Sequence, residues 1–188
     1  MVTAEQKVAV SMMHQSGKFK TMGTADFRAL ELPYVGKELS MIVFLPSKVD
    51  GLAQFERTLT AEKLDEWLSQ FREWKFAAVE LPKFRLSAEF EIAQTLSAMG
   101  MPLAFSDGAD FSGMTTREGL KISEIIHKAF VDVNEEGTEA AAATGSGVKA
   151  RMRMQPLDFL ADHPFMFLIR DNRTGSILFM GCVKNPQV

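Results

Sequence analysis

The sequence predicts an α+β protein with antiparallel or mixed sheets and a few helices. Short apolar or alternating runs that end at proline or glycine occur along most of the chain, and such runs are typical of strands. Two stretches that follow the first strands instead repeat large apolar residues at helical spacing. The predicted order is a hairpin, then helices, strands and one more helix, and finally many strands. This order favours the α+β class.

Composition restricts the function classes. The chain has 188 residues, of which 46% are apolar, and this suffices for one domain or two small ones. The net charge of −3 argues against a nucleic-acid partner. A single cysteine excludes an internal disulfide or a thiolate zinc cluster. No apolar run reaches the roughly 20 residues of a membrane span, so no membrane partner is expected.

The first predicted elements are a hairpin and two helices. Residues 27–32 and 39–45 read as antiparallel strands that end at prolines, with a turn over 35–38. Residues 52–59 repeat apolar side chains at helical spacing. Thr60 is the expected N-cap of a second helix over 61–71, whose apolar face should lie in the core.

The remaining elements follow from the same signals. Beyond the helices, the pattern predicts strands over 76–81 and 84–90, a helix over 92–99 that ends at Gly100, a loop over 105–115, a long strand over 120–133, and closing strands over 165–170 and 176–183 joined by a turn at 172–175. We therefore expect strands to dominate the second half of the chain.

The titratable side chains show no recognisable active site. The three histidines are far apart in the sequence: His14, His127 and His163. This separation favours hydrogen-bonded structural histidines over catalytic or metal-binding ones. Cys182 lies in an apolar strand, which favours an inert thiol, and Asp107 and Asp110 favour a solvated turn over a calcium loop. No cofactor, no metal site and no enzymatic activity are predicted.

Residues 134–150 differ sharply in composition from the rest of the chain, because Val148 is their one large apolar residue. Composition alone favours a flexible Ala/Gly linker, and a short Ala-rich helix over 136–143 is a second reading. In a third reading the segment is extended, and one face then carries small side chains: Thr138, Ala140, Ala142, Thr144, Ser146 and Val148. Such a face could slide over a packed core without steric resistance.

Basic residues follow this segment. Arg151 and Arg153 lie on a stretch that should be exposed, and each is followed by a methionine. A trypsin-like protease recognises arginine through a buried acidic pocket. The stretch is therefore a candidate protease recognition site.

Several runs together resemble a known family. They are VNEEGTEAAAAT at 133–144, LPKF at 81–84, GADFSGM at 108–114, HKA at 127–129, HPFMFLI at 163–169, LFMG at 178–181 and NP at 185–186. In this order they resemble the serpins, the serine protease inhibitor superfamily. The resemblance implies one serpin-like, multi-sheet domain over 1–188, corresponding to the C-terminal portion of the family fold. The chain is expected to start near a strand at 7–13, and nothing in it resembles the family's mostly helical N-terminal half.

The resemblance also implies a mechanism. Residues 135–154 would be an exposed reactive loop with its reactive bond between Arg151 and Met152, or alternatively between Arg153 and Met154. The protein would be a suicide-substrate inhibitor of trypsin-like serine proteases rather than an enzyme. After cleavage the loop would insert into the central sheet. The hinge would comprise Glu135, Glu136, Gly137, Thr138, Glu139, Ala140, Ala141, Ala142 and Ala143.

Further implications concern conformation and location. His127 matches a position beneath the central sheet and would have a conformational role. Gly145 and Gly147 would slow insertion, because glycine disfavours strands.

The resemblance favours an extracellular location. The alternative function is a non-inhibitory fragment that acts as a protease substrate or interaction module, with self-association through exposed strand edges.

Overall fold

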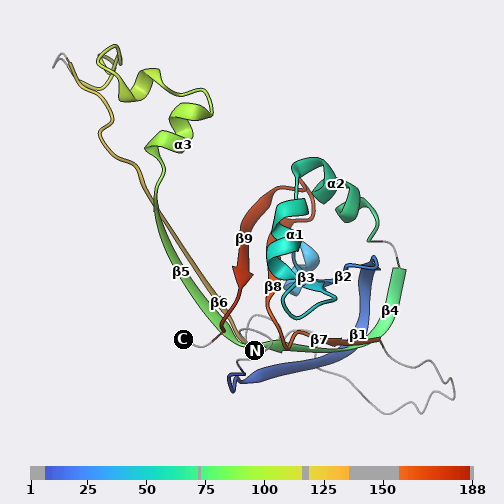
Figure 1. Ribbon diagram of the computed structural model, residues 1–188. Helices are drawn as coiled ribbons and strands as arrows, with labels where there is room; N and C mark the ends of the chain where they lie inside the picture. Colours follow the sequence, from blue (N-terminus) through green and yellow to red (C-terminus); the bar gives the residue numbers. More distant parts are fainter. Residues whose placement is uncertain (1–6, 72, 116–118, 136–156, 187–188) are drawn as a thin grey trace, which may run out of the picture. The chain divides into compact units, whose positions relative to one another are not determined.

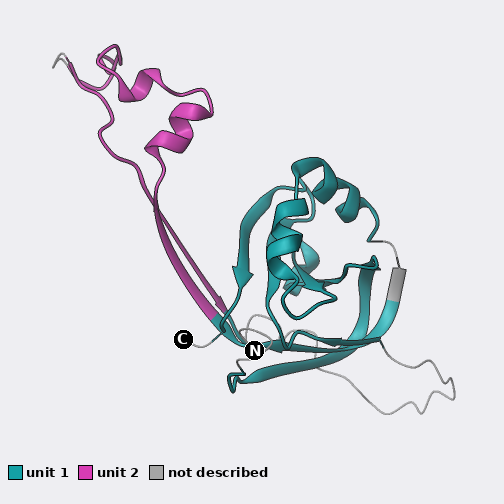
Figure 2. Cartoon of the chain, in the orientation of Figure 1, with its two compact units in different colours: residues 1–84, 133–188 teal, residues 85–132 magenta. Residues whose placement is uncertain are grey.

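The computed structural model describes residues 7–71, 73–115, 119–135 and 157–186 (Figure 1). They belong to two compact units, residues 1–84 with 133–188 and residues 85–132 (Figure 2). In these ranges no helix is long and apolar enough to cross a membrane.

The first unit is built on a seven-stranded mixed sheet in the order β7-β4-β1-β2-β3-β8-β9. Its strands are β1 (Met12–Gly23), β2 (Phe27–Pro33), β3 (Leu39–Pro46), β4 (Glu73–Pro82), β7 (Leu157–Leu160), β8 (Phe165–Asp171) and β9 (Ile177–Val183). Neighbouring strands are antiparallel except β4 and β7, which are parallel. The predicted α+β class with mixed or antiparallel sheets and few helices is confirmed.

The predicted hairpin is β2–β3, which pairs from Phe27 with Pro46 to Pro33 with Ser40. A single turn of 3-10 helix, η1 (Val35–Lys37), connects the two strands. Gly36 has φ of 78° there, a left-handed conformation that glycine adopts without steric cost. The predicted turn is therefore confirmed.

Two helices, α1 (Leu52–Thr58) and α2 (Ala61–Ser69), cover one face of this sheet (Figure 1). The Thr60 side chain accepts a hydrogen bond from the Lys63 backbone N–H at 3.3 Å, which confirms the predicted N-cap. Aromatic rings fill the interface, and the Phe27 ring lies 4.8 Å from that of Trp67 and 5.1 Å from that of Phe55. The predicted apolar helix face is therefore part of the core.

Strand β8 lies at the centre of the packing. Its residues from Phe165 to Leu168 are all buried, although successive side chains point to opposite faces of the sheet. On the face away from α1 and α2, the Phe84 ring lies 5.8 Å from that of Phe165 and 5.2 Å from that of Phe167. Both faces of the sheet are thus covered at β8.

The second unit contains the two-stranded sheet of β5 (Phe84–Glu91) and β6 (Ile126–Val133). Helix α3 (Ala93–Ala98) and a 3-10 turn, η2 (Leu103–Phe105), lie between them in the chain. The predicted helix at 92–99 is confirmed to within a residue at each end. Gly100 follows it with φ of 112°.

Two predicted strand boundaries are wrong. The strand expected over 120–133 begins only at Ile126, because the preceding residues bond to the α3–η2 segment. There the Ile122 N–H donates to the Ala104 carbonyl at 2.9 Å. The strand expected over 7–13 is instead β1, which runs from Met12 to Gly23 because ten of its residues pair with β4.

Candidate functional site

The site that the sequence singles out is the segment between β6 and β7. Glu135 is described, whereas the rest of the hinge and both candidate bonds lie outside the described residues. These positions are Glu136, Gly137, Thr138, Glu139, Ala140, Ala141, Ala142, Ala143, Arg151, Met152, Arg153 and Met154. The structure does describe the residues at the two ends of the segment, Glu135 after β6 and the strand β7.

The entrance of the segment is fixed by an ion pair. Lys83 Nζ lies 2.6 Å from Glu135 Oε2, which joins the end of β6 to the residue between β4 and β5. The hydrogen bond from Lys83 lowers the pKa of Glu135, and a backbone hydrogen bond adds to this effect. Both side chains are about half exposed, so solvent screens their attraction. The pair therefore mainly fixes the position of Glu135 relative to Lys83 and adds little to the stability of the fold.

Strands β5 and β6 are held together by further charge pairs. Arg85 donates from Nε and Nη2 to Asp132 Oδ2, at 3.0 Å and 2.7 Å. Its guanidinium carbon also lies 6.0 Å from the centre of the Phe130 ring. Nearer the other end of the strands, Lys128 Nζ lies 3.0 Å from Glu89 Oε2. Opposite charges on neighbouring strands help to specify the pairing of β5 with β6.

The second edge of β6 is open among the described residues, because β5 is the neighbour of β6 in its sheet. An open edge presents backbone N–H and C=O groups that can pair with an additional strand. The segment between β6 and β7 follows shortly after this strand.

The exit of the segment is anchored at β7. Phe159 is buried, and the Arg28 Nη1 donates to the Asp158 carbonyl at 2.9 Å. The Arg28 guanidinium carbon also lies 5.9 Å from the centre of the Phe159 ring. Just after β7, the Ala161 N–H donates to the Glu80 carbonyl at 2.9 Å. The chain leaving the segment is thus fixed to the edge of the seven-stranded sheet.

The histidines do not come together into a catalytic cluster. The side chain of His163 is largely buried, with Nδ1 2.8 Å from Asp162 Oδ1 and Nε2 2.7 Å from the Pro46 carbonyl oxygen. This arrangement matches the predicted hydrogen-bonded histidine. His14 is exposed on β1, and His127 is exposed on β6, where its conformational role stays a prediction. No group of metal-binding side chains occurs in the part of the chain that the structure describes.

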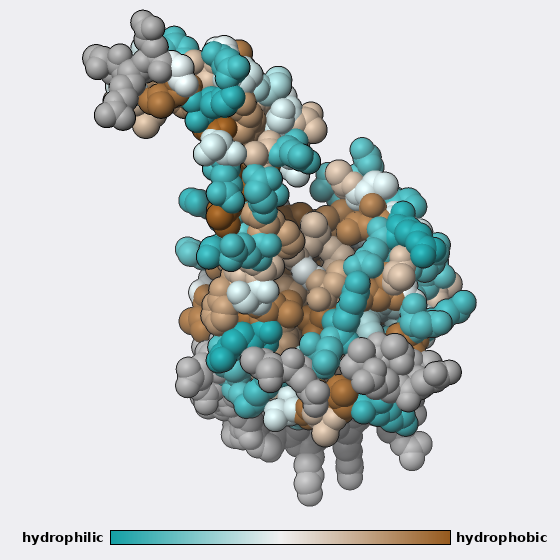
Figure 3. Space-filling view, turned by 60° about the vertical axis from the view of Figure 1, so that its left-hand side comes forward, coloured by the Kyte–Doolittle hydropathy of each residue, from teal (hydrophilic) through white to brown (hydrophobic). Residues whose placement is uncertain are grey.

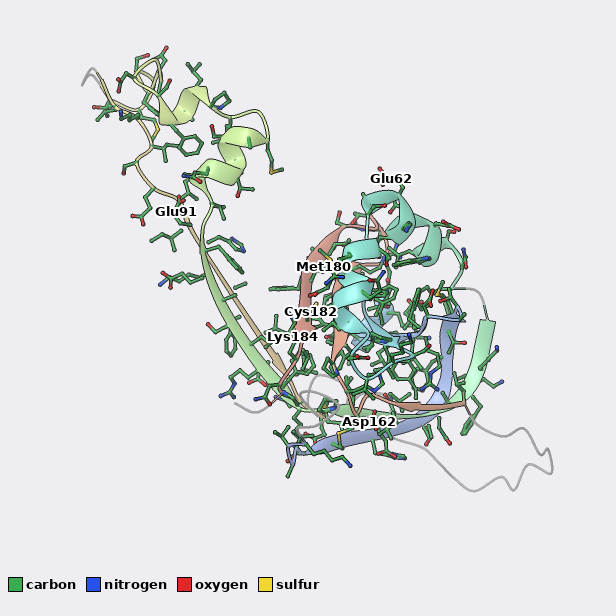
Figure 4. The ribbon with its side chains drawn as sticks, in the orientation of Figure 1. Glu62, Glu91, Asp162, Met180, Cys182 and Lys184 are labelled. Carbon is green, nitrogen blue, oxygen red and sulfur yellow. The ribbon has the colours of Figure 1, made fainter. Side chains whose placement is uncertain are left out.

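Cys182 lies on β9, between Met180 and Lys184 along the strand direction (Figure 4). Partial burial raises the pKa of its thiol from 9.0 to about 12, and a hydrogen bond with Glu56 acts in the same direction. Because the thiolate is the reactive form, the geometry supports the predicted inert thiol. Asp107 pairs with Lys121 at 2.6 Å, which agrees with the predicted solvated turn.

Sequence reasoning missed the residues that fix the two ends: Lys83, Arg85 and Asp132 at the entrance and Arg28 at the exit. A signal was present, since Lys83 belongs to one of the family-like motifs and lies at the start of a predicted strand. Its partner could be identified only once β5 was paired with β6.

Comparisons with known proteins agree on the family. The family model "Serpin (serine protease inhibitor)" matches residues 1–186. Human serpin B4 is 46% identical over 183 residues, which are 95% of this chain and 47% of that protein. The leukocyte elastase inhibitor of Xenopus laevis is 46% identical over 189 residues, covering 97% of this chain and 49% of that protein.

A solved structure shows the same fold. The crystal structure of uncleaved ovalbumin aligns with a TM-score of 0.82 at 35% identity, over 98% of this chain and 47% of ovalbumin. The chain therefore spans about half the length of the proteins it matches. The expectation of an extracellular location gains no support from these relatives. The family model, the relatives and the fold together establish that this chain belongs to the serpin family, as a partial serpin.

Proposed function

We propose that this chain acts as a serpin-type inhibitor of trypsin-like serine proteases, with Arg151 as the residue that the protease recognises. The protease serine would attack the carbonyl carbon of Arg151. The peptide bond to Met152 would break, the amine of Met152 would leave with a proton, and an ester to Arg151 would remain. Insertion of the loop into the sheet would then trap this ester. The alternative bond is Arg153–Met154.

Membership in the serpin family supports the part of this proposal that concerns protease inhibition. The name of the Xenopus laevis relative states that it inhibits leukocyte elastase, which makes a protease the expected partner here as well. The choice of a trypsin-like target rests on the sequence alone. Arginine pairs with a buried carboxylate in the specificity pocket, whereas small apolar side chains suit elastase-like pockets.

The two anchored ends support the insertion step. The segment starts at β6, whose second edge is open among the described residues, and ends at β7, which is fixed to the other sheet. A cut between these ends would free the entrance side to fold back along β6. Small side chains at Thr138, Ala140 and Ala142 keep the cost of burial in a sheet low.

A second function is favoured by the length of the chain. Because the chain spans about half of its relatives, a loop inserted beside β6 would lack its second neighbour unless another segment supplied it. In that case the protein would be a protease substrate or an interaction module. Self-association through exposed strand edges belongs to this second function.

The test is incubation with trypsin and, separately, with leukocyte elastase, followed by denaturing electrophoresis and mass spectrometry. The proposal expects an SDS-stable adduct with trypsin whose mass is that of trypsin plus residues 1–151. Arg151→Ala should abolish the adduct. Arg173→Ala, in the exposed turn between β8 and β9, is the matched control and should retain it. Retention in Arg151→Ala together with loss in Arg153→Ala would assign the alternative bond.

The same experiment separates the two functions. Cleavage after Arg151 without an adduct would show that the chain is a substrate. Thr138→Arg tests insertion directly, because it places a charged group on the side that should become buried. We expect that this variant is cleaved but forms no adduct.

A further inference from the structure

A cavity of about 440 Å³ opens between the two helices of the first unit and the loops beside them. Exposed apolar side chains alone do not identify a binding site in this chain, because hydrophobic residues reach the surface over a broad area (Figure 3). The cavity differs because aromatic and charged side chains from several elements converge on it. Its volume lies within the range of small-molecule sites.

The walls of the cavity come from the β1–β2 loop with the start of β2, the β3–α1 loop, α1 and α2, all within the first unit. Described residues of β8 and β9 do not line it, and it shares no residue with the candidate reactive segment. The cavity is therefore separate from the site considered above.

Aromatic rings form the floor of the cavity. The Phe55 ring stacks on the Trp67 indole, with centroids 5.4 Å apart and an angle of 27° between the planes. The Phe27 ring packs edge-on against both, at 5.1 Å and 4.8 Å. Phe27 and Phe55 are almost fully buried, whereas Trp67 is only partly buried. A further aromatic ring can therefore pack on the part of the Trp67 indole that remains open.

The rim of the cavity carries two carboxylates and two ammonium groups. They belong to exposed side chains: Asp26, Asp50, Lys48 and Lys63. In the part of the chain that the structure describes, none of the four takes part in an ion pair. The rim thus has no net charge at neutral pH, and both kinds of charge are available to a ligand. A ligand with one positive and one negative group complements this rim.

Hydrogen bonds and close packing fix the loops of the rim. The Ser47 N–H donates to the Asp26 carbonyl at 2.7 Å, and Ser47 Oγ donates to the Ala25 carbonyl at 3.0 Å. Gly51 lies where a Cβ would be only 2.9 Å from Pro46 Cβ, so a larger residue would shift the loop. The cavity is therefore formed before a ligand arrives, which lowers the entropic cost of binding.

We propose that this cavity binds a small zwitterionic aromatic molecule of the kind represented by a free aromatic amino acid. The aromatic ring packs on Trp67, the ammonium group lies near Asp26 or Asp50, and the carboxylate lies near Lys48 or Lys63. Because the rim is exposed, solvent weakens each charge contact, and burial of the ring supplies most of the affinity. The charges then decide which aromatic molecule is accepted.

Aromatic molecules with a single charge fit less well. An aromatic cation would be attracted by the carboxylates and by the ring faces but repelled by the two lysines. An aromatic carboxylate would be attracted by the lysines and repelled by the aspartates. These two kinds of molecule therefore serve as probes of the proposal.

The test is titration of the full chain with L-phenylalanine, followed by the backbone amide shifts in heteronuclear NMR. Phenethylamine lacks the carboxylate, hydrocinnamate lacks the ammonium group, and L-alanine lacks the ring. We expect saturable shifts at residues 47–51 and 63–67 with L-phenylalanine, and at least about tenfold weaker binding of each analogue. Absence of saturable shifts with L-phenylalanine would overturn the proposal, and so would equally tight binding of any analogue.

Variants locate the binding to the cavity. Ala25→Phe fills its mouth from an exposed position and should weaken binding of L-phenylalanine at least about tenfold. Replacement of both lysines, Lys48→Met with Lys63→Met, should weaken L-phenylalanine similarly but strengthen phenethylamine. A general loss of structure would not produce this opposite change.

Lys18→Met is the matched control, because Lys18 is exposed on β1 and does not line the cavity. It should leave the binding of both probes unchanged, and circular dichroism should show that every variant keeps the native strand content. Equal weakening by this control would overturn the assignment to the cavity. No readout involves a protease, so the outcome is independent of inhibition.

Discussion

Lys83 and Glu135 form a 2.6 Å ion pair that joins the residue between β4 and β5 to the first residue of the predicted hinge. The chain positions are 52 residues apart, yet the contact fixes where β6 ends. The candidate reactive segment starts at this point, so the pair fixes the residue from which the segment begins.

Removal of this pair should change the end of β6 more than the global fold. In Lys83→Met, amide hydrogen exchange near the end of β6 should become faster, while the core strand β8 stays protected. The same change should appear in the unaltered protein at low pH. Since the pKa of Glu135 is lowered in the folded chain, the pair stabilises the fold above the ordinary carboxyl pKa and loses this effect as the pH falls through the lowered value. Lys128→Met, at the far end of β6, is the control. Equal exchange in both variants would contradict a local role.

The contact of Arg85 with Asp132 should contribute modestly to the pairing of β5 with β6. Arg85→Ala should lower the free energy of opening of these strands by about 0.5–1 kcal/mol, because Arg85 donates two hydrogen bonds to one carboxylate oxygen of Asp132 but the pair is partly exposed. Hydrogen exchange of the β5 and β6 amides measures this opening. The exchanged pair Arg85→Asp with Asp132→Arg should recover part of the loss, and no recovery would argue against a direct charge interaction.

The attachment of β7 to the seven-stranded sheet, where the chain leaves the candidate segment, should depend on Phe159. Phe159→Ala removes a fully buried ring from β7 and should lower the free energy of unfolding by about 3–5 kcal/mol. Leu160→Ala is a neighbouring control, and its loss should be about 1 kcal/mol or less because Leu160 is 39% exposed. Urea unfolding of both variants provides the comparison. Similar losses in the two variants would show that β7 is not anchored through this ring.

Cys182 should resist alkylation in the folded protein. With a pKa of about 12 its thiol is protonated at about pH 8, so iodoacetamide should react at least about a hundredfold more slowly than with the unfolded chain. Ser87→Cys places a second thiol at an exposed position of β5 and should react rapidly. Mass spectrometry distinguishes the two sites. Rapid modification of Cys182 in the native state would show that β9 opens readily.

Local signals predicted the elements whose pairing is local. The β2–β3 hairpin and the Thr60 cap follow from residues within a few positions of one another, and both are present. Strand β7 gave no such signal, because its four residues pair in parallel with residues of β4 that lie 80 positions earlier in the chain. The same reason explains why the ion pair of Lys83 with Glu135 was not predicted.

The strand boundaries were predicted wrongly where the backbone pairing of the residues differs from what their side-chain pattern indicates. Leu120 and Ile122 alternate as a strand would, but the Ile122 backbone N–H donates to the Ala104 carbonyl in η2 instead of to a sheet. Strand β1 was expected too early because its later residues, such as Lys18 and Lys20, are polar and gain their strand conformation from β4. The reactive bond itself was inferred from the family pattern, and its residues lie outside the described ranges.

The central place of β8 has a consequence for any chain cut between β6 and β7. The piece that begins after such a cut contains β8, which lies between β3 and β9 and is buried on both faces. The two pieces of a nicked molecule would therefore stay together without a peptide bond between them. Native mass spectrometry should record an unchanged mass plus one water, and the smaller piece should separate only when detergent dissolves the core.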